Sequence, residues 1–282
     1  MYEAFYGLRE KPFSILPDPE VIYWGRAHRM AFAMLEFGVM NNSGFTVITG
    51  EVGSGKTTLV RHLLRKIDPR TINVGLITNT PQSREELLQW VLYSLGQHVE
   101  GSSAALLKAF NDHVYAEHSR GRRIILIVDE AQNLGEGALE SLRMLSNVNV
   151  DKTQYLQLIL VGQPQLKQIL TKPDLLQFAQ RVSSDYHLRP LAQLEVAKYI
   201  DFRTSSAGAG HALFSPKAID LIAKASGGVP RVINILCDTA LVYGFSLATP
   251  QITPQIVAEV IQDKSNYGIF PINHMASTNR VS

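Results

Sequence analysis

The fold of this 282-residue chain is decided by the stretch Gly50-Glu51-Val52-Gly53-Ser54-Gly55-Lys56-Thr57. It matches the pattern G-x-x-x-x-G-K-[S/T] in full and lies between an apolar, β-branched segment at residues 45–49 and a helical pattern at residues 56–67. Glycines let such a loop curl so that successive backbone N–H groups point at phosphate oxygens, and the following helix adds the positive end of its dipole. The stretch therefore predicts a phosphate-binding loop between a strand and a helix.

Two side chains of this loop have separate expected roles. We expect Lys56 to reach the β- and γ-phosphates of a nucleotide, and the Thr57 hydroxyl to bind Mg²⁺. An ordinary glycine turn would not explain why the match falls between a strand and a helix, so we predict nucleotide binding. The predicted nucleotide-binding residues of the loop are Gly50, Glu51, Val52, Gly53, Ser54, Gly55, Lys56, Thr57 and the adjoining Thr58.

A second motif, with the sequence IILIVDEAQ at residues 124–132, places two carboxylates after an apolar strand. Ligands bind at the carboxyl ends of strands in parallel sheets, so Asp129 and Glu130 are expected at that edge. We expect Asp129 to hold the Mg²⁺ shell, directly or through water, and Glu130 to orient or deprotonate the attacking water. Two acids after a strand are a weak signal alone, but they gain weight downstream of the phosphate loop. A glutamate in the second position favours hydrolysis over binding alone.

Apolar segments alternate with amphipathic helical patterns up to about Arg189. One helix is expected to begin at Ser83, because Glu86 follows three residues later in a capping-box pattern. The predicted strands lie at residues 45–49, 73–78, 124–128 and 156–162. Apolar strands alternating with helices are typical of a parallel sheet covered on both faces. We therefore predict an α/β fold, a P-loop parallel sheet sandwiched by helices.

The pattern changes after Arg189, where no further strand is convincing. Helical segments are expected at residues 191–206, 215–226, 230–247 and 253–264, with Gly and Pro in the breaks between them. We therefore predict three regions. They are an N-terminal segment plus α/β nucleotide-binding domain at residues 1–189, a small all-helical lid domain at 190–264, and a flexible tail at 265–282.

Composition narrows the function classes. The 27 Lys and Arg against 25 Asp and Glu give a net charge of +2, which argues against a dedicated nucleic-acid binder. The single cysteine, Cys237, excludes an intrachain disulfide and paired-cysteine zinc sites. The N-terminus lacks a signal-peptide pattern, and no stretch approaches the roughly 18 uninterrupted apolar residues of a spanning helix. We therefore expect a soluble, cytoplasmic protein without a direct membrane span.

Several segments appear in an order that resembles one family. They are residues 5–23, the helix entered at His28, and residues 49–61, 128–134, 158–166 and 226–238. Over about residues 1–264 the sequence is similar to AAA+ ATPases of the general secretion pathway A type, including the pilus-biogenesis and exopolysaccharide-locus members. Larger secretion members continue into a transmembrane helix and a peptidoglycan-binding domain, and we expect this chain to be a short form without either.

The resemblance implies ATP and Mg²⁺ as cofactors and assigns further roles. Gln163 matches the sensor 1 polar residue, which would contact the attacking water or the γ-phosphate; the alternative is a residue of a strand-end turn. Arg231 matches the sensor 2 arginine, which would reach the γ-phosphate of the same subunit from the lid. Arg181 resembles the arginine finger that completes a neighbouring subunit's site. Arg189 is an alternative arginine finger. For either residue, the alternative to a catalytic role is a structural ion pair on the surface.

Two assignments from the resemblance concern neighbouring segments. The stretch around Tyr23 and His28 resembles the one that packs over adenine, so Tyr23 is a candidate to stack on the base. Packing between this stretch and the lid is the alternative. Asn79, after the second predicted strand, is a candidate partner of Glu130 in a switch that restrains hydrolysis.

The resemblance implies an ATP-hydrolysing switch that forms a nucleotide-dependent homo-oligomer. Its partners would be envelope assembly proteins of a secretion, pilus or polysaccharide-export system, reached from the cytoplasmic side at the inner membrane. A DNA-binding ATPase regulator of the transposition target-selection type shares this core and is the alternative, although the net charge of +2 gives it little support. A nucleotide-binding scaffold with negligible turnover is a third possibility.

Overall fold

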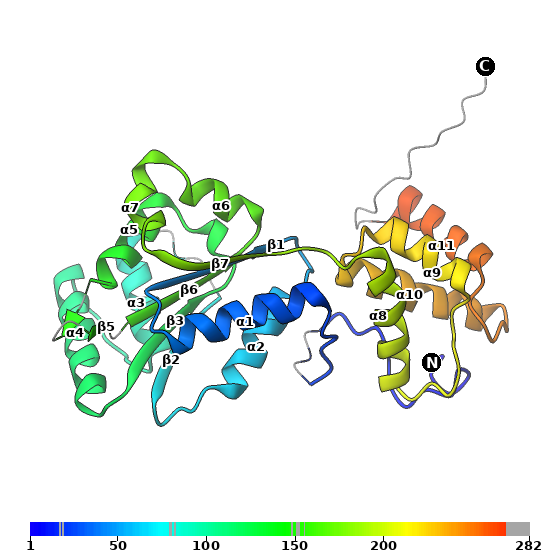
Figure 1. Cartoon of the computed structure of the whole chain (residues 1–282), viewed down its shortest axis with the longest axis horizontal. Helices are drawn as coiled ribbons and strands as arrows, with labels where there is room; N and C mark the ends of the chain where they lie inside the picture. Colours follow the sequence, from blue (N-terminus) through cyan, green and yellow to red (C-terminus); the bar gives the residue numbers. More distant parts are fainter. Residues whose placement is uncertain are drawn as a thin grey trace, which may run out of the picture. The chain divides into compact units, whose positions relative to one another are not determined.

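The computed structural model describes residues 1–16, 18, 20–78, 81, 83–147, 149–150, 153–154 and 156–268. The chain divides into two compact units, whose elements are drawn in Figure 1. The helical unit comprises Met1–His28, Val52–Thr58 and Arg189–Ser282, and the sheet unit comprises Arg29–Glu51 and Leu59–Leu188. Each unit has its own cluster of buried apolar side chains.

The sheet unit is built on five parallel strands in the order β2-β3-β6-β1-β7. Their bounds are β1 Phe45–Gly50, β2 Ile72–Ile77, β3 Arg123–Val128, β6 Leu156–Gly162 and β7 Val182–Leu188. The strands β1 and β6 are buried along their whole length, as expected for apolar strands covered on both faces. The predicted parallel α/β sheet is therefore confirmed. Two further strands, β4 Asn149–Val150 and β5 Thr153–Gln154, form a separate antiparallel pair.

The fifth strand, β7, is missing from the sequence-based expectation. It is an edge strand, and its sequence VSSDYHL alternates between buried and exposed positions. Ser184 and Leu188 are buried, whereas Ser183, Asp185 and His187 are exposed. Only the interior strands of such a sheet require continuous apolar sequence, so this strand carries no apolar run that would reveal it.

Helices cover both faces of the sheet (Figure 1). Their bounds are α1 Arg26–Met40, α2 Lys56–Lys66, α3 Arg84–Ser94, α4 Ser103–Ser119, α5 Glu136–Leu145, α6 Pro164–Leu170 and α7 Leu176–Ala179. Short 3₁₀ turns occupy Ala131–Asn133 and Pro173–Leu175. Buried side chains of α3 to α7 form one core with the sheet, while α1 and α2 lie outside that core. The expected start of α3 is confirmed, because the Ser83 hydroxyl accepts the Glu86 N–H at 3.1 Å.

In the part of the helical unit that the structure describes, four helices lie at the predicted positions. They are α8 Gln193–Ser206, α9 Pro216–Ser226, α10 Pro230–Ser246 and α11 Pro254–Tyr267. Their common core includes buried aromatic side chains from the N-terminal segment, namely Tyr2, Tyr6 and Phe13. The Phe13 ring meets Phe214 edge-on with 5.8 Å between ring centroids. A small domain buries little apolar surface, and these aromatic side chains enlarge the hydrophobic core of the helical unit.

The compact units differ from the linear division drawn from the sequence. Residues 1–28 group with the helices rather than with the sheet, because their aromatic side chains are buried in the helical core. The boundary at Arg189 occurs in both divisions. The division into domains at 189/190 stays a prediction, and most of the predicted tail, residues 269–282, lies outside the described residues. Among the described residues, no helix is both long enough and apolar enough to cross a membrane.

Candidate nucleotide-binding site

The phosphate loop, residues 50–57, connects the end of β1 at Gly50 to the start of α2 at Lys56. Two of its glycines adopt left-handed backbone conformations, with φ +77° at Gly53 and φ +101° at Gly55. Side chains other than hydrogen are disfavoured there. A Cβ atom added to Gly53 would also overlap with the Cβ of Arg231. Gly53 and Gly55 are therefore required by the local backbone.

Two carbonyl groups of the loop are bound by donors from elsewhere in the helical unit. The Gly53 oxygen accepts the backbone N–H of Arg231 at 3.2 Å, in the first turn of α10. The Ser54 oxygen is 2.9 Å from Nε2 of His28, whose ring is buried. The side chain of Arg231 itself is exposed. The structure therefore brings Arg231 next to the loop through its backbone.

The loop suits the phosphates of a nucleotide on three observations. The N-terminus of α2, an 11-residue helix, begins inside the loop, and its first residue, Lys56, is 6% exposed. The glycine conformations allow backbone N–H groups to face an anion. The Ser54 hydroxyl is buried and has no hydrogen-bond partner among the described residues. Glu51 and Val52 are exposed, whereas Thr57 and Thr58 are half-buried.

The acidic motif lies at the carboxyl end of β3 in the sheet unit. Asp129 is 5% exposed, and its backbone N–H donates to the Ile77 carbonyl at 2.9 Å. Its Oδ1 accepts the N–H of Glu130 at 2.9 Å. Glu130 has φ 53°, a left-handed conformation that is rare outside glycine. This turn directs the chain away from the strand directly after the two acids, at the sheet edge where parallel β1 also ends.

The Glu130 carboxylate is held by two side-chain amides. Nε2 of Gln132 donates to Glu130 Oε2 at 2.6 Å, and Nε2 of Gln163 donates to the same oxygen at 3.3 Å. Oε1 of Gln132 accepts the backbone N–H of Gln163 at 2.9 Å. The structure therefore brings Glu130 and Gln163 together and adds Gln132, to which the sequence analysis gave no role. No local sequence pattern marks this role, because the contact of Gln132 with Gln163 joins residues 31 positions apart.

Mg²⁺ does not require a cage of protein ligands at such a site. Within the described residues, no group of three or more His, Cys, Asp or Glu side chains gathers as a metal site. Mg²⁺ bound with a nucleotide keeps several waters and phosphate oxygens and takes only one or two protein ligands. A hydroxyl and a carboxylate are hard oxygen donors that fit this ion, so Thr57 and Asp129 stay the candidate ligands.

Two other expected nucleotide-site residues have different outcomes. The ring of Tyr23 packs against Tyr199 and Phe202 of α8, with centroid distances of 5.7 and 5.8 Å. This is the packing alternative named for that stretch, and base stacking by Tyr23 stays a prediction. Asn79, the candidate switch partner of Glu130, lies outside the described residues.

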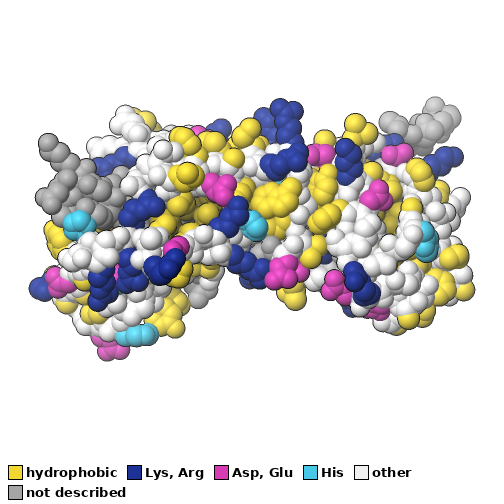
Figure 2. Space-filling view, turned by 60° about the horizontal axis from the view of Figure 1, so that its bottom comes forward, with side chains coloured by type: hydrophobic (Ala, Val, Ile, Leu, Met, Phe, Trp, Pro, Cys, Tyr) yellow, Lys and Arg dark blue, Asp and Glu magenta, His cyan; other side chains and the backbone are white. Residues whose placement is uncertain are grey.

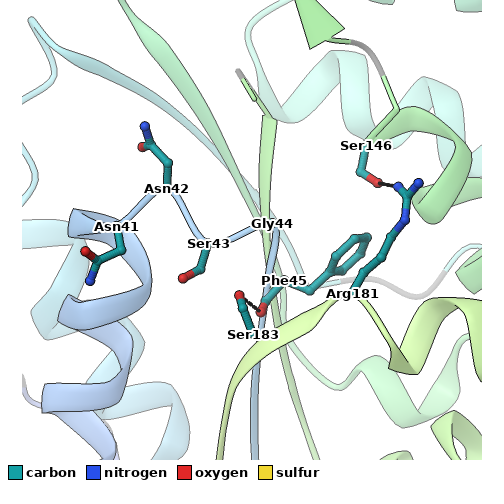
Figure 3. Close-up of a pocket in the computed structure, with 8 residues that line it drawn as sticks. All are labelled: Asn41, Asn42, Ser43, Gly44, Phe45, Ser146, Arg181 and Ser183. Atoms are coloured by element: carbon teal, nitrogen blue, oxygen red, sulfur yellow. Dashed lines mark hydrogen bonds between the residues drawn. The ribbon is translucent and has the colours of Figure 1, made fainter. Parts of the chain in front are cut away.

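Arg181 lies at the amino ends of the strands, whereas the two acids lie at the carboxyl ends. It directly precedes β7, and its Nη1 donates to the Ser146 hydroxyl at 3.1 Å (Figure 3). It lines a polar cavity of about 480 Å³ together with Asn41, Asn42, Ser43, Gly44, Phe45, Ser146 and Ser183. Because Phe45 begins β1, this cavity lies at the amino ends of the strands. Arg189, in contrast, follows the carboxyl end of β7 and is exposed.

Sequence comparisons connect the chain to two kinds of protein. Residues 39–170 match the family described as AAA domain. The chain is 40% identical over 254 residues to general secretion pathway protein A of Aeromonas hydrophila, covering 89% of this chain and 46% of that protein. It is 34% identical over 117 residues to the Mu-like prophage FluMu DNA transposition protein B of Haemophilus influenzae, covering 42% and 38%. The chain thus spans less than half the length of either curated relative.

Solved structures share the fold at low identity. The Aeropyrum pernix ORC2 protein, in ADPNP-ADP complexes, gives a TM-score of 0.67 at 16% identity, covering 90% of this chain and 71% of that one. Cdc6p from Pyrobaculum aerophilum gives 0.68 at 16% identity, covering 85% and 68%. The Thermotoga maritima RuvB Holliday junction branch migration motor gives 0.54 at 18% identity, covering 88% and 73%. The chain therefore shares the fold of these P-loop AAA+ proteins, its residues 39–170 match an AAA domain, and over most of its length it is similar to general secretion pathway protein A.

Proposed function

We propose that the chain hydrolyses ATP in the presence of Mg²⁺ and acts as a molecular switch in the assembly of an envelope secretion, pilus or polysaccharide-export system. The observation that carries the proposal is the phosphate loop, in which Gly53 and Gly55 hold left-handed conformations next to the start of α2. The 40% identity to general secretion pathway protein A supports the envelope role. We propose that the protein acts from the cytoplasmic side and reaches the inner membrane through a partner.

Each side chain has a distinct task in this proposal. Lys56 neutralises charge on the β- and γ-phosphates, and Thr57 and Asp129 hold Mg²⁺. The metal ion, when bound, neutralises charge that develops on the phosphate oxygens. Glu130 orients and deprotonates the attacking water. Gln132 and Gln163 position the Glu130 carboxylate through the amide hydrogen bonds described above.

We further propose that hydrolysis requires a homo-oligomer. Arg181 lies at the amino ends of the parallel strands, whereas Glu130 lies at their carboxyl ends. A rigid sheet therefore cannot bring both side chains to the same phosphate. Arg181 therefore suits the site of a neighbouring subunit, where it would stabilise charge in the transition state. Arg189 follows the carboxyl end of β7, which favours a role within its own subunit. Arg181→Ala should keep nucleotide affinity and lose turnover, with partial recovery when mixed with Glu130→Gln; no recovery would contradict the trans role.

Two substitutions test the central activity. Lys56→Ala should abolish ATP binding, whereas Glu130→Gln should retain binding and lower turnover by about a hundredfold or more. Lys66→Ala provides a matched control, because Lys66 lies in the last turn of the same helix and pairs with Glu36 on the surface. Phosphate release and equilibrium binding of ATP would be measured for all three. Turnover that persists in Glu130→Gln would contradict hydrolysis at this site.

The transposition-regulator function is the second candidate, because the match to the prophage transposition protein B is 34% identical. On the face drawn in Figure 2, Lys and Arg side chains are scattered among acidic and apolar ones. That distribution gives little support to a basic DNA-binding band on this face. Binding of duplex DNA would be measured with and without ATP at several salt concentrations. Strong, ATP-dependent and salt-sensitive binding would favour the transposition role, whereas capture of envelope proteins by Glu130→Gln would favour the first proposal.

A further inference from the structure

The phosphate loop poses a requirement that the motif residues do not meet themselves. When backbone N–H groups face a phosphate, the neighbouring carbonyl groups face away from it, and buried carbonyls need hydrogen-bond donors. Two donors outside the loop meet this need: the backbone N–H of Arg231 at Gly53 and the imidazole of His28 at Ser54. The His28 contact is made by a side chain, so substitution can remove it.

The geometry defines the protonation of His28. A carbonyl oxygen only accepts hydrogen bonds, so the nitrogen 2.9 Å from it, Nε2, carries the proton. The ring is 6% exposed, and its Nδ1 makes no hydrogen bond within the part of the chain that the structure describes. Burial lowers the pKa of His28 and thus favours the neutral ring. His28 is therefore a neutral donor directed at the loop.

The imidazole ring of His28 and Gly55 constrain each other. A Cβ atom added to Gly55 would lie 3.0 Å from Nε2 of His28, which is closer than nearly all real Cβ contacts. Gly55 also has φ +101°, which a side chain would disfavour. The imidazole edge therefore fills the space that a side chain at residue 55 would need, and it holds the loop at the Ser54–Gly55 peptide.

The support behind His28 is well fixed. Oε1 of Glu195 accepts the N–H of Arg26, the first residue of α1, at 2.9 Å. Oε2 of Glu195 accepts the N–H of Ala192 at the start of α8, at 3.1 Å. One carboxylate thus binds the N-termini of both helices, and a negative charge is favourable at each of them. His28 lies two residues beyond Arg26 in α1 and is held in place by this link.

We infer that His28 is a positioning residue of the phosphate loop, whose Nε2–H keeps the Ser54 carbonyl turned outward and thereby keeps the loop in its phosphate-binding shape. The inference rests on the proposed nucleotide binding and names a residue outside the motif on which that binding depends. The contact is to the loop rather than to a base. His28 therefore affects every nucleotide that places phosphates in the loop, whatever its base.

The test compares three substitutions by equilibrium titration with ATP, ADP and GTP. His28→Leu and His28→Asn remove a donor that reaches Ser54, because the Asn amide is too short. His28→Gln keeps one, since its amide nitrogen reaches about as far as Nε2. The Leu and Asn variants should bind ATP and ADP roughly tenfold more weakly, which corresponds to about 1.4 kcal/mol, and the Gln variant within about threefold of the wild type. GTP affinity should fall by the same factor as ATP affinity.

Other outcomes overturn the inference. Wild-type affinity in His28→Asn would show that the donor is not needed, and this variant serves if His28→Leu does not fold. An equal loss in His28→Gln would show that the donor is not what the ring contributes. A loss for ATP without a loss for GTP would indicate base recognition. Failure of the proposed function looks different, because wild type and Lys56→Ala would then bind ATP equally poorly.

Discussion

The phosphate loop and the acidic turn after β3 both contain left-handed backbone conformations, but different interactions hold them in place. The loop relies on backbone: two glycines adopt left-handed conformations, and its carbonyls accept hydrogen bonds from His28 and Arg231. The acidic turn relies on side chains, because Glu130 adopts a left-handed conformation without being glycine and is held by the amides of Gln132 and Gln163. The conformation of the phosphate loop requires that a few positions carry no side chain. The position of the Glu130 carboxylate depends on a hydrogen-bond network, which single substitutions weaken by degrees.

The largest effect is expected from a substitution in the phosphate loop. Gly53→Ala combines a disfavoured φ of +77° with overlap between the new Cβ and the Cβ of Arg231, so the loop must change shape. We expect ATP affinity to fall by about a hundredfold or more, measured by equilibrium titration. Gly96→Ala is the matched control, because Gly96 has φ +78° but nothing within 4 Å of an added Cβ. It should lower stability by about 1 kcal/mol and leave ATP affinity unchanged.

A smaller effect is expected when a hydrogen bond to the Glu130 carboxylate is removed. Gln132→Ala removes the 2.6 Å hydrogen bond to Glu130 and should lower turnover about tenfold while ATP affinity stays within about twofold. Gln165→Ala, which truncates an exposed glutamine of α6, is the control. The double variant with Gln163→Ala should lose less than the sum of the two single losses in activation free energy, because both amides bind one oxygen. Strict additivity of the two losses would contradict a shared positioning role.

The same contrast explains what could be predicted from sequence. The loop residues are contiguous and their spacing is fixed by phosphate geometry, so Lys56 and Thr57 could be named as candidates directly. The two acids could be named as candidates from the apolar strand before them. Gln132 could not, because its hydrogen bond to the Gln163 backbone joins residues 31 positions apart and depends on how β3 and β6 pair.

The fold shows the same limit. Interior strands such as β1 and β6 are buried throughout and mostly apolar and could be predicted, whereas the edge strand β7 alternates between buried and exposed positions and could not. The His28–Ser54 hydrogen bond spans 26 residues and depends on where α1 begins. Local chemistry is readable from local sequence, but long-range partners require the packed structure.

A third prediction separates backbone from side chain at one residue. Arg231→Ala keeps the backbone N–H that binds the Gly53 carbonyl, so ADP affinity should stay within about twofold even if the side chain serves the γ-phosphate. Arg231→Pro removes that donor in the first turn of α10, where proline is tolerated, and should lower ADP affinity by about fivefold. Circular dichroism would check that α10 still forms. Equal ADP affinity in both variants would show that the backbone hydrogen bond does not support the loop.

The smallest effect concerns stability and uses one histidine in each unit. Burial lowers the pKa of His28, and the hydrogen bond to the Ser54 carbonyl and the charge of Glu195 partly oppose this shift. Burial also lowers the pKa of His113, where Glu117 acts in the opposite direction and Arg120 and Arg122 in the same direction. The Asn73 side-chain amide donates to His113 Nε2 at 3.1 Å, which likewise suits a neutral ring. Each histidine is therefore protonated more readily in the unfolded chain than in the folded one.

Because the unfolded state binds more protons below its pKa of about 6.5, stability should be greatest above that pH and fall as the pH drops toward the lower folded pKa values. Between pH 7.5 and 6.0 each histidine should cost at most about 0.8 kcal/mol, measured by urea unfolding. His28→Asn and His113→Asn should each flatten the pH dependence. Only His28→Asn should also reduce the stabilisation by added ATP, since it removes the donor to the phosphate loop while His113 lies in the sheet unit. An ATP effect of equal size in both variants would mean that the two histidines are coupled to the loop alike.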